Sequence, residues 1–368
     1  WRAEQANEVY ALDLASLIAG DPAAAAGVDV TGMDIHPLVR IGAALDDLEA
    51  WHRAQQRPAA ALEARLERLR RLRAAFTEEV DRTAIDRHLA AILPQYRQVP
   101  WWAVGVAQLA EFAREGSDPQ RQVRARTLAA EGAAAYPGSV GGERCRAIVD
   151  QIDAPEYSGN AMAADGPGAR SIQVTHRNLE RLYFRAYALD LVGWIGTSRD
   201  WNLLPRGEQV ERIVDRQAPV ATWEVALPAT PDFLPHTTYV TPPMAGHGVY
   251  LLVSSARADF GKRDNELYVA PLILTDLVLI GQRPAEDRLE VRAVSGTSGR
   301  PRAGVRLHLY QRDWQQGHHV VARATAGADG VAGFALASHQ LSGGYFVLGQ
   351  DGQDLALDQA GRWWYDGG

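Results

Sequence analysis

The spacing of apolar residues changes once along the chain, near residue 153. Before that point apolar positions recur every three or four residues, which is the period of an amphipathic α-helix. Two such stripes are the leucines at 62–72 and the set Leu38, Ile41, Leu45 and Leu48. We expect the leucine stripe at 62–72 to be core, with a partner-binding coiled coil as the alternative. Short Pro and Gly breaks between the segments predict an antiparallel helical domain over residues 1–153.

The end of this helical domain carries two further signals. The sequence AAAYPGS, followed by another helix, resembles the end of a tetratricopeptide-type helix pair, although the full consensus is not repeated. Along the last helix, Cys145 shares an apolar side with Ile148 and Ile152. Because free cysteine behaves as a small apolar residue, we expect a buried thiol there.

The second part of the chain has the pattern of strands. Residues 154–168 are rich in Gly, Ala, Pro and Asp, and predict a linker or an extended first strand. After them the apolar period is two, with turn residues between the runs, which indicates antiparallel strands. We expect one β-sandwich over 169–281, with a helical insertion near 199–215, and a second over 282–368.

The connection between the sandwiches and one turn are specific enough to predict. The chain should cross from one sandwich to the next near residues 276–286, through a short segment with a Gly and a Pro. Each sandwich should have its own core, and the short connection should restrict their relative motion to a hinge. Within the second sandwich, the Asp329-Gly330 dipeptide predicts a tight turn with Gly330 at positive φ.

Composition limits the partners. The net charge of −7 argues against a nucleic-acid partner, which favours a basic surface. Arginine supplies nearly all the positive charge, Lys262 being the only lysine, and the arginines are spread rather than clustered. No apolar run approaches the roughly 20 residues that a membrane-spanning helix needs, so no transmembrane segment is expected. The single cysteine, Cys145, excludes an internal disulfide and a CxxC metal site.

Sequence motifs for catalysis and cofactor binding are absent: HExxH, GxSxG, the Walker A loop and GxGxxG do not occur. His318 and His319 are adjacent, so on a strand they point to opposite faces, and we expect solvated residues rather than a metal pair. His236 and His247 flank a hairpin-like region and should be polar edge residues. We therefore expect no catalytic residue, no cofactor, no metal and no enzyme activity in this chain.

Aromatic pairs are the candidates for contact with another molecule or domain. Trp101 and Trp102 follow a proline at a predicted helix start, and Trp363 and Trp364 lie at the end of the sequence. Adjacent residues on a helix diverge by about 100°, so one of Trp101 and Trp102 should be core while the other is exposed for contact. The alternative is a tryptophan packed at a domain seam.

Six short segments occur in a recognisable order within residues 119–368. They are AYPGS with CRAIVDQIDAP, NLERLYFRAYALD, WEVALPATPDFLPHTTYVTPPMAGHGVYLLVSS, LILTDLVL, SGRPRAGVRLHLY and DGQDLALD. In this order they resemble the bacterial α2-macroglobulin family, in its long form with an N-terminal helical region. The resemblance implies the N-terminal part of a larger protein, with two macroglobulin-like β-sandwich domains after the helices.

The resemblance implies a structural function rather than a catalytic one. The family's thioester forms in a Cys-x-Glu-Gln motif, whereas Cys145 is followed by Arg-Ala-Ile, so no thioester is expected here, and no bait region is identifiable. The implied role is the scaffold and docking portion of a protease-trapping protein of the cell envelope, periplasmic or at the cell surface. Its partners would be other domains of the same protein, attacking proteases and an envelope protein. The alternatives are an adhesin or secretion-linked binding module, and an accessory region of a carbohydrate-active enzyme.

Overall fold

A computed structural model gives the fold of the chain. It describes residues 9–20, 35–161, 166, 168–198, 203–205, 207–261, 263, 265–285, 287–313, 315–336 and 344–358. The chain forms two compact units. The first, which we call the helical unit, comprises Trp1–Pro155 with Thr230–Leu234. The second, which we call the sandwich unit, comprises Glu156–Ala229 with Pro235–Gly368.

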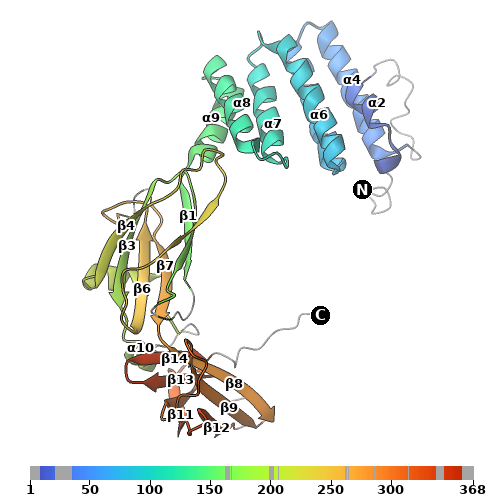
Figure 1. Cartoon of the computed structure of the whole chain (residues 1–368). Coiled ribbons are helices and arrows are strands. Elements are labelled where there is room, and N and C mark those ends of the chain that lie inside the picture. The colour runs from blue at the N-terminus through green and yellow to red at the C-terminus, as the bar shows by residue number, and fades with distance from the viewer. Residues whose placement is uncertain are drawn as a thin grey trace. The chain divides into compact units, whose positions relative to one another are not determined.

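The helical unit is built of helices joined by short turns (Figure 1). Its elements are η1 (Val9–Ala11), α2 (Leu14–Ala19), α4 (Pro37–Ala54), α5 (Pro58–Ala75), α6 (Glu79–Ile92), η2 (Leu93–Tyr96), α7 (Trp102–Arg114), α8 (Arg121–Ala135) and α9 (Val140–Asp153). Proline opens both α4 and α5, where its missing N–H is not needed and its fixed φ favours the first turn. At the start of α9, the side chain of Ser139 accepts a hydrogen bond from the backbone N–H of Gly142. Local signals of this kind fix where the helices begin.

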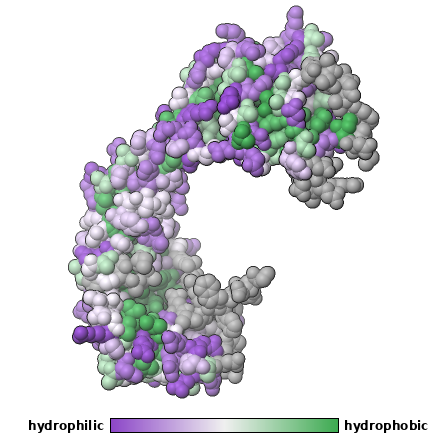
Figure 2. Space-filling model, turned by 45° about the vertical axis from the view of Figure 1, so that its right-hand side comes forward, coloured by the Kyte–Doolittle hydropathy of each residue, from purple (hydrophilic) through white to green (hydrophobic). Residues whose placement is uncertain are grey.

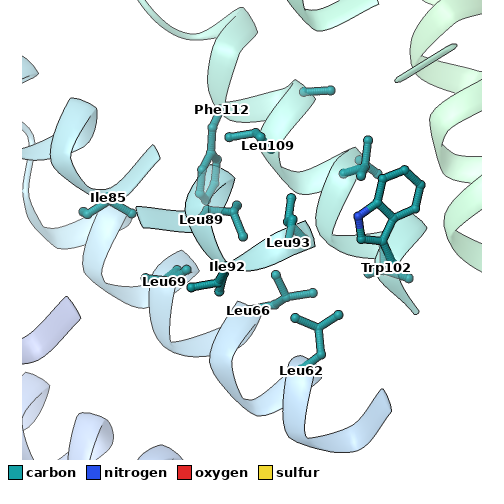
Figure 3. Packing of buried hydrophobic residues seen from close by; sticks show 14 of the residues in the cluster. Leu62, Leu66, Leu69, Ile85, Leu89, Ile92, Leu93, Trp102, Leu109 and Phe112 are labelled. Atoms are coloured by element: carbon teal, nitrogen blue, oxygen red, sulfur yellow. The ribbon is translucent and has the colours of Figure 1, made fainter. Parts of the chain in front are cut away.

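The core of the helical unit lies between α5, α6 and α7 (Figure 3). The leucine stripe at 62–72 is buried there and belongs to the same apolar cluster as Leu89 of α6 and Trp102 of α7. The prediction that this stripe is core is therefore confirmed. Full burial stabilises the fold by about 1.5–3 kcal/mol for each such side chain, so the stripe is a main source of the unit's stability.

The first sandwich of the sandwich unit consists of two antiparallel sheets, ordered β1-β2-β5 and β4-β3-β6-β7. Its elements are β1 (Glu156–Ala161), β2 (Ile172–Arg177), β3 (Arg181–Ala188), α10 (Leu191–Thr197), α11 (Glu208–Arg216), β4 (Ala221–Ala226), β5 (His236–Val240), β6 (Gly248–Ser255) and β7 (Tyr268–Leu274). Buried and half-buried residues alternate along β2, beginning with Ile172. In the core the rings of Phe184 and Trp223 stack with centroids 5.0 Å apart. The predicted strand period thus corresponds to one buried face.

The second sandwich has the same plan, with sheets ordered β12-β9-β8 and β11-β10-β13-β14. Its strands are β8 (Leu277–Ala285), β9 (Arg288–Ser295), β10 (Arg306–Gln311), β11 (His319–Thr325), β12 (Val331–Ala335), β13 (Tyr345–Asp351) and β14 (Asp354–Asp358). Leu289 and Val291 of β9 are buried in its core. Gly330 has a φ of 74°, as its turn dipeptide predicted. The fold class predicted from the sequence, helices followed by two antiparallel sandwiches, is confirmed.

Two element boundaries complete the description of the sandwich unit. Of the two expectations for residues 154–168, a linker or an extended first strand, the strand is observed as β1, which pairs antiparallel with β2. Gly159 within it disfavours a strand in isolation, but pairing with a neighbour overrides that preference. At the other junction β7 ends at Leu274 and β8 already begins at Leu277. The chain therefore enters the second sandwich before residue 282.

Each sandwich has its own apolar core, as expected, and a further apolar cluster joins the two sandwiches. Leu191 and Ile195 of α10 and Val249 of β6 belong to this seam together with Tyr310 and Phe346 of the second sandwich. The rings of Tyr310 and Phe346 stack with centroids 4.9 Å apart. The physical reason is that β13 is buried on both faces, one toward its own core and one toward the seam. We call this cluster the sandwich seam.

A buried carboxylate adds polar bonds to the sandwich seam. Asp354 of β14 accepts hydrogen bonds from Thr275 Oγ1 at 2.9 Å, from the Asp276 backbone N–H at 3.0 Å and from Arg302 at 2.8 Å. His247 Nδ1, next to β6, lies 2.9 Å from the same carboxylate. Burial acts to raise the pKa of Asp354, but the hydrogen bonds from Arg302, Asp276 and Thr275 hold it below its ordinary value. Asp354 therefore ties the chain crossing between the sandwiches to the second sandwich.

Candidate interaction groove

Chemistry-bearing side chains do not gather into a metal centre in the part of the chain that the structure describes: no group of three or more His, Cys, Asp or Glu is arranged to hold an ion. A cavity of about 610 Å³ lies beside α11 and is lined largely by apolar side chains such as Val210 and Leu251. Its carboxylates, on Glu211, Asp215 and Glu266, are exposed.

None of the helices that the structure describes is both long enough and apolar enough to cross a membrane. The surface of the helical unit is nonetheless not uniformly polar. Figure 2 shows apolar patches among hydrophilic side chains on the visible face of its helices. Contiguous exposed apolar patches mark interaction sites more often than isolated apolar residues do.

Helix α4 turns leucines to solvent and acids to the protein interior. Leu48 is 42% exposed and Trp51 is 50% exposed, whereas Asp46 and Glu49 are buried. Of the apolar stripe on this helix, only Leu38 is buried. This is the reverse of the usual arrangement, in which the apolar face of a surface helix packs on the core.

The acids of α4 are buried because they pair with arginines of α5. Arg68, only 1% exposed, pairs with both Asp46 and Glu49. Glu49 also accepts a hydrogen bond from Arg65 Nε at 2.9 Å, and Arg68 donates to the backbone oxygen of Ile18 at 3.2 Å. Burial lowers the pKa of Arg68 to about 10, so it remains charged at neutral pH. We call these side chains the ionic seam.

An apolar groove of about 520 Å³ lies along the exposed face of α4. Leu45 and Leu48 line its α4 side, and Trp101, just before α7, lines it as well. On the α5 side the small lining residues are Ala59, Ala60 and Ala64. Because alanines leave the α5 backbone uncovered, an apolar side chain of a partner can approach it closely. We call this site the α4–α5 groove.

The first of the two tryptophan pairs proposed as contacts is divided between core and surface. Trp102 is buried among the core residues of α5 and α7 (Figure 3). Trp101 is partly exposed, and its indole Nε1 donates to Glu63 Oε2 at 2.8 Å. The predicted difference in burial is confirmed, and the hydrogen bond holds the Trp101 ring at the groove. Trp363 and Trp364 lie outside the described residues.

Cys145 is buried, as predicted, in the same apolar cluster as Ile148 and Ile152. Its Sγ donates to the backbone oxygen of Ala103 at 3.4 Å. Burial raises the pKa of the thiol to about 11, so it stays protonated at neutral pH. A protonated, buried thiol is a poor nucleophile, so the residue serves packing.

The adjacent histidines at the start of β11 differ from the expectation of two solvated residues. His318 is buried, and its Nδ1 accepts a hydrogen bond from the Asp313 backbone N–H at 3.2 Å, while His319 is exposed. The His318 ring is buried because it packs edge-on against the ring of Phe346. His247, expected as a polar edge residue, instead faces the carboxylate of Asp354.

Sequence reasoning found Trp101 but missed the groove beside it. Three charged positions in the sequence indicate which face of α4 meets α5. Asp46 and Glu49 interrupt one side of α4, and Arg68 stands within the leucine stripe of α5. Acids on one helix and an arginine in the apolar stripe of the next indicate an ionic contact between them, which leaves the leucines of the first helix on another face.

Comparison with solved structures adds a likeness for part of the chain. It is similar to native alpha-2-macroglobulin from Escherichia coli spanning domains MG0-NIE-MG1, at 15% identity and a TM-score of 0.42, over 55% of this chain and 64% of that chain. It is similar to the structure spanning domains NIE-MG1, at 14% identity and a TM-score of 0.42, over 55% of this chain and 97% of that one. It is also similar to the native conformation of E. coli alpha-2-macroglobulin, at 14% identity and a TM-score of 0.32, over 55% of this chain and 12% of that chain.

The chain is similar to bacterial alpha-2-macroglobulin. The chain spans 64% of the first of these solved structures and 12% of the third. No protein-family model and no curated protein matches the chain.

Proposed function

We propose that this chain is the non-catalytic scaffold and docking portion of a bacterial α2-macroglobulin-like protease-trapping protein of the cell envelope, in the periplasm or at the cell surface. The observation that supports docking most strongly is the open apolar face of α4. Its leucines line a groove while its acids are held inside by Arg68. An apolar groove with an oriented aromatic ring suits the apolar anchors of a partner segment.

The sandwich unit supplies the scaffold in this proposal. Its two sandwiches share an apolar seam and the hydrogen bonds of Asp354, which favour a fixed spacing over a free hinge. We propose macroglobulin-like domains at 169–281 and 282–368, after a helical domain at 1–153. β1 and the start of β8 extend the two sandwich domains toward the N-terminus.

Three kinds of partner follow from this role: other domains of the same larger protein, attacking proteases and a protein of the envelope. We assign the α4–α5 groove to the envelope protein. The alternatives make different predictions. An accessory region of a carbohydrate-active enzyme, or an adhesin, would bind through the faces of the sandwiches, and substitutions in the helical unit would leave its binding unchanged.

Fractionation of the producing cells tests this function. The natural protein should sediment with the envelope membranes, and the double variant Leu48→Asp, Trp101→Ala should be released into the soluble fraction. Val80→Asp is the matched control, because Val80 is exposed on α6 outside the groove and should keep the wild-type distribution. Circular dichroism would check that both variants are folded. Envelope association unchanged in the double variant would refute docking through the groove.

A further inference from the structure

The cavity beside α11 has the size and the walls of a small-molecule site. Its volume of about 610 Å³ lies within the roughly 300–1,000 Å³ that is usual for ligand pockets. Val210 and Val214, one turn apart on α11, line it together with Leu251 of β6 and Val269 of β7. These side chains belong to an apolar cluster that is distinct from the cores of the two sandwiches. An apolar ligand body that entered the cavity would cover this surface.

Asn265 fixes the cavity wall between β6 and β7. Its Oδ1 accepts a hydrogen bond from the backbone N–H of Ala256 at 3.2 Å, and its Nδ2 donates to the backbone oxygen of Gly261 at 2.7 Å. Asn265 also lines the cavity. A wall that is held in place by the protein's own hydrogen bonds loses little conformational freedom when a ligand binds, which favours affinity.

Phe260 lines the same wall in a strained conformation. Its φ is 59°, in the left-handed region that bulky residues rarely adopt. The residue is buried, and the guanidinium carbon of Arg185 lies 3.9 Å from the centroid of its ring. Strained backbone persists where the surroundings hold it, and it gathers at ligand-binding sites. The Phe260 ring is therefore a fixed aromatic surface at the cavity.

Two carboxylates at the cavity indicate the charge of its ligand. Asp215 of α11 and Glu266, shortly before β7, both line it and are exposed. In the part of the chain that the structure describes, neither carboxylate is paired with an arginine or a lysine. Arg212 and Arg216 of α11 do not line the cavity. A concave apolar site with negative charge at its opening attracts cations and disfavours anions.

We propose that this cavity is a binding site for an amphipathic organic cation. The apolar body of the ligand lies against Val214 and Phe260, and its cationic group lies at Asp215 and Glu266. Burial of the apolar body supplies most of the affinity. The exposed carboxylates select the sign of the charge, because ion pairs in contact with solvent are individually weak. The site belongs to the sandwich unit and is independent of the α4–α5 groove.

Three probes with one apolar body and different charges test the site: 4-phenylbutylamine, 4-phenylbutanol and 4-phenylbutyrate. Ligand-observed nuclear magnetic resonance titrations of the whole chain would give the Kd of each. We expect saturable binding, at least about threefold tighter for the amine than for the alcohol, and weakest for the carboxylate. About 0.5 M NaCl should narrow these differences. Absence of saturable binding of the amine, or equal affinity for the three probes, would overturn the proposal.

Variants locate the binding in this cavity. The double variant Asp215→Asn, Glu266→Gln should weaken binding of the amine about three- to tenfold and leave binding of the alcohol unchanged. Val214→Trp should fill the cavity and abolish binding of both. If Val214→Trp does not fold, as circular dichroism would show, the double variant at exposed positions still carries the test. Glu180→Gln is the control, because Glu180 is exposed and does not line the cavity. An equal loss of amine binding in the Glu180 variant would refute the site.

Discussion

The ionic seam of the helical unit and the sandwich seam both join neighbouring parts of the fold, the first through ion pairs and the second mainly through apolar side chains. In the helical unit α4 joins α5 through Arg68, Asp46 and Glu49. In the sandwich unit the two sandwiches join through apolar side chains, including the stacked pair Tyr310 and Phe346. Where charges make the contact, leucines remain on the surface; where apolar residues make it, that apolar surface is covered.

The difference shows how a helix can keep apolar side chains exposed for binding while ion pairs hold it in the fold. An ion pair inside a protein gives little net stability, but it is highly sensitive to the loss of one partner. The ionic seam therefore fixes the orientation of α4 at the expense of stability, and leaves Leu45 and Leu48 at a groove. The sandwich seam contributes stability and offers no such opening. We infer that binding and support are divided between the two units.

Loss of Arg68 should have the largest effect. In Arg68→Ala the carboxylate of Asp46 is left buried without its arginine partner, whereas Glu49 keeps Arg53 and Arg65. Breaking such a buried pair costs about 3–5 kcal/mol. Urea unfolding followed by far-ultraviolet circular dichroism should show the loss in the helical unit. The exposed Arg71, paired with Glu67 on the same helix, is the control, and Arg71→Ala should change stability by less than about 1 kcal/mol. Equal effects of the two substitutions would contradict the ionic seam.

Phe346→Ala should have the second-largest effect and lower the free energy of unfolding by about 3 kcal/mol. It leaves a cavity in the sandwich seam and removes the stacking with Tyr310. Calorimetry is the measurement. If the seam couples the two sandwiches, their melting should shift as one transition. A shift confined to the second sandwich, with the first unchanged, would restore the picture of independent cores joined by a hinge.

Gly330→Val should lower the free energy of unfolding by about 2 kcal/mol or more. The glycine has a φ of 74°, and a Cβ there would meet the backbone oxygen of Ala293 at 2.5 Å. The loss should appear in the sandwich unit and leave the helical unit unchanged, as calorimetry can show. Gly352→Val is a matched control, since it shares the positive φ but meets no neighbour, and it should lose less.

The pH dependence of the sandwich unit should be the smallest effect. The lowered pKa of His176 means that the unfolded chain takes up a proton first as the pH falls below about 6.5. Stability should therefore decrease from pH 7 toward pH 5, and His176→Gln should flatten that slope in part. His308, whose pKa burial also lowers, contributes the remainder. The ionisable groups around His176 are Glu156, Tyr157, Arg177 and His236. An unchanged slope in the variant would rule His176 out as its source.

Most of the fold could be predicted from the sequence because apolar period follows secondary structure. The stripe at 62–72 has one apolar face and is core, and the alternation in β9 is a buried strand face. What the sequence leaves open depends on tertiary pairing. Both a linker and an extended strand were possible over residues 154–168, and pairing with β2 makes β1 a strand. Phe346 looks like any core residue of β13 until a second sandwich packs on its other face.

Of the residues that line the α4–α5 groove, only Trp101 could be selected from the sequence. Trp101 could be chosen because adjacent residues on a helix point about 100° apart, which lets one tryptophan lie in the core and the other at the surface. The groove itself depends on which face of α4 meets α5. The apolar stripe alone favours the leucines for that contact, and the outcome is reversed by the pairing of Arg68 with Asp46 and Glu49. Charge partners on separate helices are not visible to a periodicity argument.

The central claim is that the leucine face of α4 is a docking surface, and site-specific photocrosslinking in the producing cell tests it most directly. A photoreactive phenylalanine analogue would replace Leu45, Leu48 and, as the control, Asp47, which is exposed on a different side of the same helix. We predict one discrete adduct from positions 45 and 48, lost when Trp101→Ala is added, and none from position 47. Equal adducts from all three positions, or none from any, would contradict the account.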